Sequence, residues 1–145
     1  MTTSKITQNA FATPATEATQ AWRNHTARFT VHWGRSGAVV AANGEIDAAN
    51  AGRFSDDAQR CADCCEWLIL DLSELTFIGT AGFSALKSIS ARCASTQTRL
   101  MVIPSPALTT VVRICDPQSR LPLVESLADA LADVQRSGRP LRLVP

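Results

Sequence analysis

A nearly uninterrupted apolar run at residues 67–72 constrains the fold of this chain most strongly. Successive side chains of a strand point to opposite faces, so a run without polar alternation predicts a strand that is buried on both faces. A second run of this kind lies at residues 100–103. Such strands are typical of parallel sheets covered by helices, so the pair predicts an α/β domain.

The remaining patterns predict a regular alternation of strands and helices. Alternating apolar residues at 29–33 predict a half-buried strand, and a turn at 34–37 leads to a second strand at 38–42. A further short strand is expected at 121–124. Four helices are expected, and the residues that mark their starts are Asn50, Thr80 or Ala81, Ser105 with Pro106, and Ser126 with Asp129. The sequence therefore predicts a mixed, mostly parallel sheet with an antiparallel hairpin at its start and about four helices.

The two ends of the chain differ in composition from its middle. Residues 1–27 are rich in Thr, Ala, Gln and Asn, which predicts a flexible tail, with a short helix at 16–22 as the alternative. Residues 138–145 contain Gly138, Pro140 and Pro145 and are also expected to be a tail. One folded domain is therefore expected over residues 28–137 of the 145.

Charge and hydropathy exclude several classes of protein. The net charge is +1, so no basic excess is present to bind nucleic acid. The apolar runs are far shorter than the roughly 20 residues of a membrane span, so direct membrane insertion is not expected. The N-terminal residues have no apolar block typical of a secretory signal. Together with an odd number of cysteines, five, this predicts a cytoplasmic protein.

The motifs of common enzymes and metal sites are missing from the sequence. It contains no nucleophile elbow, no phosphate-binding P-loop and no dinucleotide-binding fingerprint. The two histidines, His25 and His32, have no nucleophile at a recognisable spacing. We therefore expect a non-enzymatic protein with no catalytic residues, no cofactor and no metal.

Cys61 and Cys64 form a C-x-x-C motif, which leaves a redox role open. The pair falls at the end of the expected helix, where the helix dipole disfavours a thiolate. Buried thiols are the simpler interpretation for the four cysteines that fall on apolar stripes, namely Cys61, Cys65, Cys93 and Cys115. Cys64 is then the thiol expected to be nearest to solvent.

Residues 70–86 carry the most informative pattern. A buried strand ends, a short loop follows, and small residues open a helix. This segment resembles the signature of STAS domains, the anti-sigma factor antagonists of bacteria. The matching residues are Asp71, Leu72, Ser73, Phe77, Ile78, Gly82 and Leu86, and upstream 44–47 (GEID) is similar to the motif that precedes the family's first helix.

The resemblance implies a regulatory protein that binds an anti-sigma factor of the histidine-kinase-like ATPase class and so controls sigma-factor-dependent transcription. It also implies phosphorylation of a hydroxyl residue just before the signature glycine. Here that position is Ala81, and Gly79 replaces the family's aspartate. Thr80 is then the one candidate phosphoacceptor, displaced by one residue. The residues that the resemblance assigns to partner binding are Asp47, Gly79, Thr80, Ala81, Gly82 and Phe83.

The triplet at 80–82 also resembles STAS subunits of bacterial lipid-transporting ABC systems, where it docks on the ATPase. An ABC ATPase is therefore the alternative partner, and an enzyme or a small-ligand sensor is a third hypothesis. Three roles stay open for Thr80: helix N-cap or plain loop residue, partner contact, and phosphoacceptor. Asp47 either caps the turn into its helix or contacts a partner.

Overall fold

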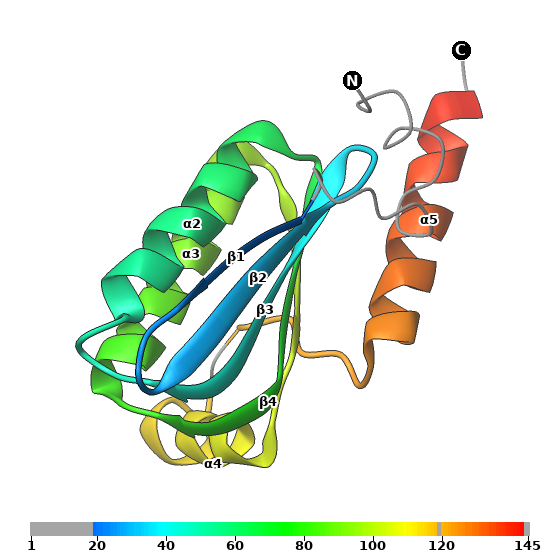
Figure 1. The fold of residues 1–145 in the computed structure, drawn as a ribbon. Coiled ribbons are helices and arrows are strands. Elements are labelled where there is room, and N and C mark those ends of the chain that lie inside the picture. The colour runs from blue at the N-terminus through cyan, green and yellow to red at the C-terminus, as the bar shows by residue number, and fades with distance from the viewer. Residues whose placement is uncertain (1–18, 119, 144–145) are drawn as a thin grey trace.

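The structure, a computed structural model, describes residues 19–118 and 120–143. Its elements, labelled as in Figure 1, are β1 (Thr19–Arg23), β2 (Ala27–Trp33), β3 (Gly37–Ile46), α2 (Ala51–Cys64), β4 (Trp67–Ile78), α3 (Thr80–Thr96), β5 (Arg99–Ile103), α4 (Pro106–Cys115) and α5 (Leu127–Leu143). The strands form one sheet, with α2 and α3 on one side and α5 on the other (Figure 1).

The sheet has the strand order β1-β2-β3-β4-β5. The pairs β1–β2 and β2–β3 are antiparallel, and the pairs β3–β4 and β4–β5 are parallel. Helices α2 and α3 make the two crossovers between parallel strands. The α/β fold with a mixed sheet, an N-terminal hairpin and four helices is therefore confirmed, although β1 makes the antiparallel pairings as numerous as the parallel ones.

The first strand corrects the predicted domain boundary. Residues 19–23 and Ala27 belong to the sheet and residues 24–26 form the turn between the strands, because β1 pairs along its whole length with β2. The ring of Trp22 stacks on Phe29 with 5.3 Å between centroids, and Phe29 stacks on Phe54 of α2 at 5.6 Å. The alternative of a helix is wrong for residues 19–22, and the rest of the expected tail, residues 1–18, lies outside the described part of the chain.

The C-terminal part differs from the prediction in two places. The expected strand at 121–124 reduces to one bridge between Val102 and Leu123, because Val102 alone bonds to it, through Pro122 O and Val124 N at 2.9 Å. The expected tail from residue 138 is wrong as far as Leu143, since α5 extends to that residue. Residues 144–145 lie outside the described ranges.

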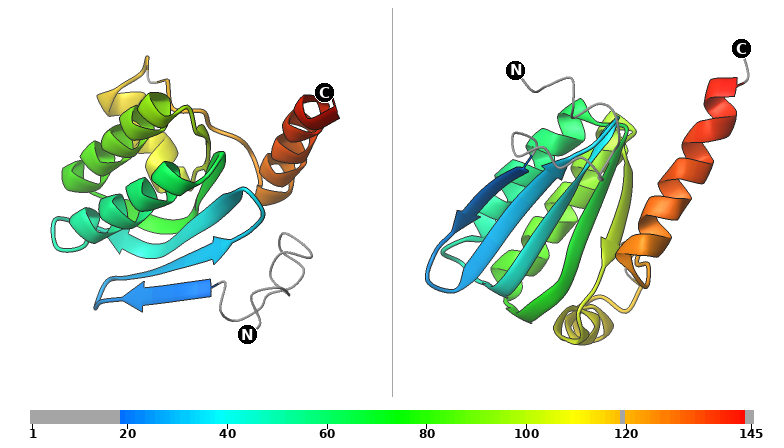
Figure 2. Two further views of the ribbon diagram at one scale, coloured as in Figure 1. Left: turned by 90° about the horizontal axis from the view of Figure 1, so that it is seen from above. Right: turned by 45° about the vertical axis from the view of Figure 1, so that its right-hand side comes forward.

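Two cores lie on opposite faces of the sheet. The larger core packs α2, α3 and α4 against the sheet and includes Phe54, Leu70 and Leu86. The smaller core packs α5 against β3, β4 and β5, with Ile69 and Met101 at its centre. Figure 2 shows α5 beside β5, while β1 lies at the other edge of the sheet. This burial on both faces explains the apolar run in β4.

Candidate functional site

The predicted site lies where the end of β3 meets the start of α3. The Gly79 N–H donates to Ile46 O at 3.0 Å, so the loop before α3 is bonded directly to the residue that precedes Asp47. The backbone of Gly82 lies against the same strand end. A Cβ atom at position 82 would stand 2.7 Å from Ile46 Cγ2. The structure therefore brings Asp47 and the 79–83 segment together at one corner of the domain.

The residues of this corner differ in how far a partner could reach them. Thr80 is exposed, Ala81 and Phe83 are half-buried, and Gly82 is buried. Ala81 packs against the main core, and Lys87 Nζ lies 5.8 Å from the centre of the Phe83 ring. Gly82 thus acts through packing, whereas the side chains of Thr80 and Phe83 face outward in part.

The start of α3 decides one of the roles left open for Thr80. Gly79 is the N-cap residue and Thr80 is the first residue of the helix, so Thr80 is not the N-cap. No side-chain hydrogen bond caps this helix, because glycine has no side chain to accept one. A capping role therefore does not account for the Thr80 hydroxyl.

Asp47 closes the turn that enters α2. Its Oδ1 accepts hydrogen bonds from the N–H of Ala49 at 3.0 Å and of Asn50 at 3.3 Å. Its Oδ2 lies 3.3 Å from the Thr26 hydroxyl, in the β1–β2 turn. Asp47 is half-buried, so it caps this turn while part of the residue stays exposed to solvent.

Asn50 does not cap α2 as the sequence predicts. It occupies the N-cap position, but its side chain makes no capping bond to the helix. Instead the amide is fully buried, accepts from Asp47 N–H at 3.0 Å and donates to Glu45 O at 3.0 Å and to Thr26 Oγ1 at 3.2 Å. Its physical role is to join the β3 end, the β1–β2 turn and α2.

Phe77 is an exposed aromatic residue at this corner that the sequence analysis did not assign to partner binding. Its side chain is 49% exposed, and its ring lies beside Gly79, with Cε2 3.4 Å from the position that a Cβ atom at residue 79 would take. Phe77 and Ile78 are neighbours in β4 and point to opposite faces of the sheet; Ile78 packs in the larger core, whereas Phe77 belongs to neither core. The exposed ring adds apolar surface beside Gly79.

The C-x-x-C motif lies at the other end of α2, away from this corner. Cys61 is buried, and burial raises its pKa to about 12. Burial also raises the pKa values of Cys65 and Cys93 to about 11. Cys64 is exposed as expected, but Cys115 is exposed too, because it is the last residue of α4 and its expected apolar stripe ends without a covering element. All five cysteines are free thiols, and Cys61 with Cys64 remains the redox candidate.

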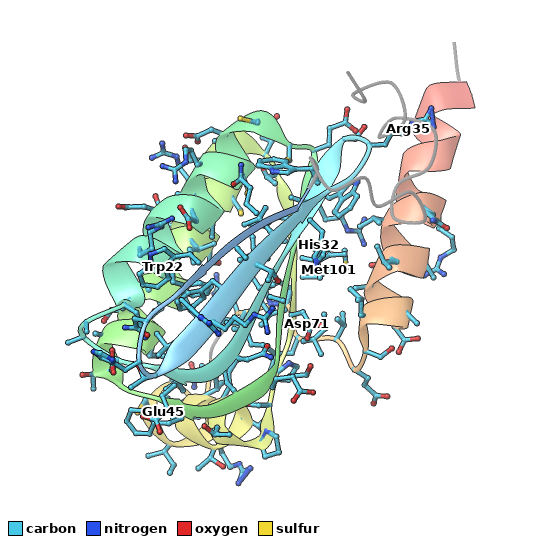
Figure 3. The ribbon with its side chains drawn as sticks, viewed as in Figure 1. Trp22, His32, Arg35, Glu45, Asp71 and Met101 are labelled. Atoms are coloured by element: carbon cyan, nitrogen blue, oxygen red, sulfur yellow. The ribbon has the colours of Figure 1, made fainter. Side chains whose placement is uncertain are left out.

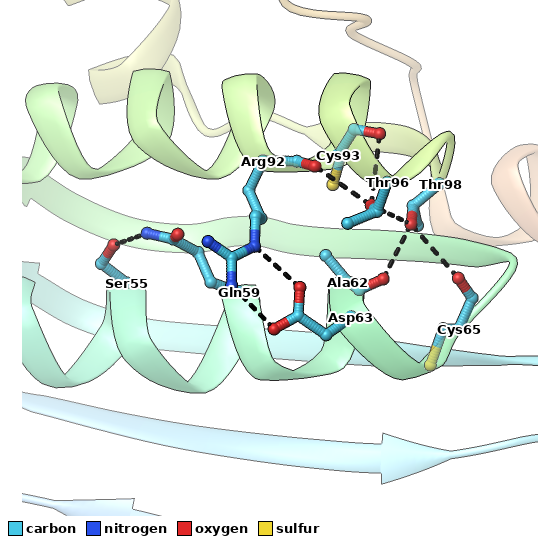
Figure 4. Close-up of polar contacts among 9 residues, drawn as sticks. All are labelled: Ser55, Gln59, Ala62, Asp63, Cys65, Arg92, Cys93, Thr96 and Thr98. Carbon is cyan, nitrogen blue, oxygen red and sulfur yellow. Dashed lines mark hydrogen bonds and ion pairs between the residues drawn. The ribbon is translucent and has the colours of Figure 1, made fainter.

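Polar contacts join this end of α2 to α3 (Figure 4). Arg92 donates to both carboxylate oxygens of Asp63 at 2.7 and 2.9 Å, and the Arg92 guanidinium lowers the pKa of that carboxyl. The hydroxyl of Thr98 lies 2.8 Å from Ala62 O, a carbonyl in the last turn of α2. These contacts give the neighbourhood of the cysteines a structural role.

Two further findings concern metal ligands and membrane-spanning helices. Within residues 19–118 and 120–143, no three His, Cys, Asp or Glu side chains form a group that could hold a metal ion. Across the same ranges, every helix is too short or too polar to cross a lipid bilayer.

Comparison with known proteins assigns the family. The STAS domain model matches residues 32–130, and the chain belongs to this family. The crystal structure of an anti-sigma factor antagonist from Mycobacterium paratuberculosis has a TM-score of 0.65 and 24% identity, over 83% of this chain and 97% of that one. SpoIIAA in its unphosphorylated form, also an anti-sigma factor antagonist, has a TM-score of 0.62 and 15% identity, over 75% of this chain and 96% of that one.

One curated relative extends the comparison at the level of sequence. Osmosensory protein A of Mycobacterium tuberculosis is 33% identical over 100 residues, which are 66% of this chain. The match spans 63% of that relative's length. The fold is thus that of anti-sigma factor antagonists, and the relative is named for osmosensing.

Proposed function

We propose that this chain is a non-enzymatic, cytoplasmic regulatory protein that binds an anti-sigma factor of the histidine-kinase-like ATPase class. Binding would withdraw the anti-sigma factor from its sigma factor and so control transcription. The observation that carries the proposal is the corner at residues 79–83, where the family signature presents Thr80 and Phe77 to solvent beside Asp47.

The chemistry of this corner suits protein docking. Covering the exposed half of the Phe77 ring would contribute about 25 cal/mol for each Å² of apolar surface removed from water. The exposed part of the Asp47 carboxylate would accept a hydrogen bond from the partner and fix its orientation. The close contact between Gly82 and Ile46 keeps the start of α3 in one position, so that little order has to be gained on binding.

Regulation would differ from the phosphorylation that the family resemblance implies. Ala81 has no hydroxyl, and a shift of one residue along a helix turns the side chain by about 100°. Thr80 therefore presents its oxygen in another direction than a residue at 81 would. We propose that the partner is bound without a phosphorylation switch at this position.

An affinity pulldown from the native host, followed by mass spectrometry, tests the partner class. We expect wild-type protein to recover an anti-sigma factor, and Phe77→Ala and Ala81→Glu to recover much less. Ala81→Glu would place a charge in a half-buried contact, where about 2 kcal/mol or more is lost without a partner for the charge. Thr80→Ala should have a smaller effect than Ala81→Glu.

Ala128→Glu, at an exposed position, is the control for a glutamate introduced at the start of a helix. Ala128 is also the second residue of a helix, but α5 lies on the opposite face of the sheet from α3. Equal loss of the partner with Ala128→Glu and Ala81→Glu would contradict the proposed surface. Since a relative is named for osmosensing, the pulldown should be repeated after osmotic stress.

Phosphorylation of Thr80 gives a second test. Incubation of the recovered partner and this protein with ATP should leave Thr80 unmodified in mass spectra, whereas Ala81→Ser should acquire phosphate at residue 81. Phosphate on wild-type Thr80, with release of the partner abolished in Thr80→Ala, would restore a phosphorylation switch displaced by one position.

The second candidate function is that of an accessory subunit of a lipid-transporting ABC system. The triplet Thr80-Ala81-Gly82 favours it, because the same small residues would let an ATPase approach the start of α3. Recovery of a transporter ATPase in the pulldown, or a neighbouring permease gene, would decide for this function. An anti-sigma factor or sigma factor gene nearby would decide for the first.

A further inference from the structure

Two arginines face one another across the hairpin formed by β1 and β2. Arg23 and Arg28 are direct partners in the antiparallel register. The Asn24 N–H bonds to Ala27 O at 3.0 Å, so the pair next to it, Arg23 with Arg28, is of the type without backbone hydrogen bonds. In this type the Cα atoms are about 4.5 Å apart and the side chains are closest. Like charges at such positions destabilise a sheet.

No carboxylate within the described residues neutralises this pair. Neither guanidinium takes part in any of the hydrogen bonds or ion pairs of residues 19–118 and 120–143. Asp57, on α2 beyond the Trp22 ring, already binds both Arg53 and Arg60. Arg23 and Arg28 are thus two exposed positive charges at this edge of the domain that form no ion pair among the described residues.

The register partners of Arg28 on the neighbouring strands continue the row that begins with Arg23, and the first of them is a neutral residue. The register partner of Arg28 on β3 is Asn43, and the partner of Asn43 on β4 is Glu74. Strands lie about 4.8 Å apart, so Glu74 stands about 10 Å from the Arg28 backbone. It forms no ion pair with either arginine in the part of the chain that the structure describes. The Asn43 side chain adds a further donor beside Arg28.

The two arginines also line a hollow. A space of about 320 Å³ is bounded by Ala21, Trp22, Arg23 and Arg28. Because Arg28 alternates with the buried Phe29, it lies on the sheet face opposite α2 and α3. On that face α5 packs against β3, β4 and β5, and β1 lies at the far edge (Figure 2). Side chains of β1 and β2 are drawn with the sheet in Figure 3, where Trp22 lies on the α2 side of β1.

We propose that Arg23 and Arg28 bind a phosphate group at this end of the β1–β2 hairpin, beside the hollow that they line. Two guanidinium groups offer paired N–H donors that match phosphate oxygens, and a doubly charged anion would turn their mutual repulsion into attraction. The site lies on the hairpin rather than at the start of α3. It is independent of the proposed partner surface and its function.

Titration with inorganic phosphate tests the site. The purified full chain is titrated at constant ionic strength, with chloride as the balancing anion, and melting temperature and isothermal heat are recorded. We expect a saturable rise in melting temperature, since a ligand of the native state stabilises it. The double variant Arg23→Gln, Arg28→Gln should bind phosphate at least about tenfold more weakly, and Arg23→Lys, Arg28→Lys should lie between.

Arg113→Gln is the matched control, because Arg113 is an exposed arginine of α4 without an ion pair among the described residues. It should titrate like the wild type. In phosphate-free buffer the double glutamine variant should melt at a higher temperature than the wild type, because the like-charge pair is gone. A non-saturating titration, or the same titration in the double glutamine variant, would overturn the proposal.

Glycerol phosphate, titrated in parallel, distinguishes the source of the group. Tighter binding than inorganic phosphate would assign the site to phosphate esters, and weaker binding would assign it to the free ion. Both results require the arginine pair and support the site. Failure of both anions to saturate would contradict it.

Discussion

Gly82 lies so close to Ile78 that a Cβ atom at position 82 would stand 2.6 Å from Ile78 Cγ1. The second contact, with Ile46 Cγ2, would be 2.7 Å. Both isoleucines are buried, so neither side chain can move into solvent to make room. This glycine therefore determines how near α3 approaches the ends of β3 and β4, which is the geometry of the proposed partner surface.

Replacing this glycine should destabilise the fold despite a better helix former. Gly82→Ala should lower the free energy of unfolding by about 1–3 kcal/mol, because overpacking outweighs the gain in helix propensity of about 1 kcal/mol. Urea denaturation followed by circular dichroism measures the change. The control is Gly52→Ala in α2, where nothing lies within 4 Å of a new Cβ atom, and a small gain is expected. Equal behaviour of the two variants would refute the close approach.

Gly79 offers room for the side chain that the family usually has. Its backbone is extended, with φ −88° and ψ −176°, which is compatible with an N-cap aspartate. Gly79→Asp should raise the free energy of unfolding by about 0.3–1 kcal/mol, through a capping bond and the helix dipole. Gly79→Asn, which lacks the charge, separates the two contributions. A clear loss of stability in both variants would show that the Phe77 ring, 3.4 Å from the position of a Cβ atom at residue 79, cannot move aside for a larger side chain.

The edge strand β1 should depend on Trp22. Trp22→Ala removes the stack on Phe29 and the contact with Arg53, whose guanidinium lies 4.8 Å from the ring centre. We expect a loss of about 2–3 kcal/mol, less than for a fully buried tryptophan because the ring is half-buried. Hydrogen exchange of the β1 and β2 amides should accelerate in the variant. If the free energy of unfolding and the hydrogen exchange rates were unchanged, residues 19–23 would behave as part of a tail and not as a strand of the sheet.

The thiols should react in two classes. Cys64 and Cys115 are exposed, so at pH 8 they should be labelled by an alkylating reagent well before Cys61 and Cys93, which are buried, and Cys65, which is half-buried; all three have raised pKa values. Mass spectrometry of peptides at timed intervals measures the order, and denatured protein should label at all five. Early labelling of Cys61 would favour the redox interpretation of the C-x-x-C motif.

The raised pKa of Cys61 predicts how the free energy of unfolding changes at alkaline pH. Burial raises the pKa of Cys61 from 9.0 to about 12, so between these values the unfolded chain releases a proton that the folded chain keeps. Stability from this group is complete below pH 9 and should decline as the pH rises toward 12. Cys61→Ala should show a flatter decline in thermal melts across that range. A wild-type curve as flat as that of the variant would contradict the burial of the thiol.

The predictions from sequence succeeded where one element carries a repeated pattern. The apolar run in β4 and the capping residue Ser105, whose side chain accepts from Leu108 N–H at 3.2 Å, needed only local information. The same holds for the STAS signature, because its matching residues lie within one segment, 71–86. Candidate site residues inside the signature, such as Thr80, could therefore be named from the sequence, and their role stays a prediction.

The predictions failed where the stabilising partner lies elsewhere in the chain. The sequence of β1, TQAWR, has no clear apolar alternation, and its order comes from backbone pairing with β2 and from the Trp22–Phe29 stack. Asn50 has the residue type of a helix cap, but its buried amide is satisfied by Glu45 O and Asp47 N–H instead. Phe77 reads as one more apolar residue, although the buried Ile78 leaves it outside the core.

By itself, then, the sequence determined the order of most strands and helices, the family and the position of the Ala81 substitution, since hydrophobic period and consecutive motifs are local properties. Only the tertiary structure decided that residues 19–23 form a strand, that Asp47 bonds to the β1–β2 turn, and that Arg23 faces Arg28. Each of these depends on which residues the sheet register places side by side. Register is set by the burial of a whole face against the helices, so it is a property of the assembled sheet.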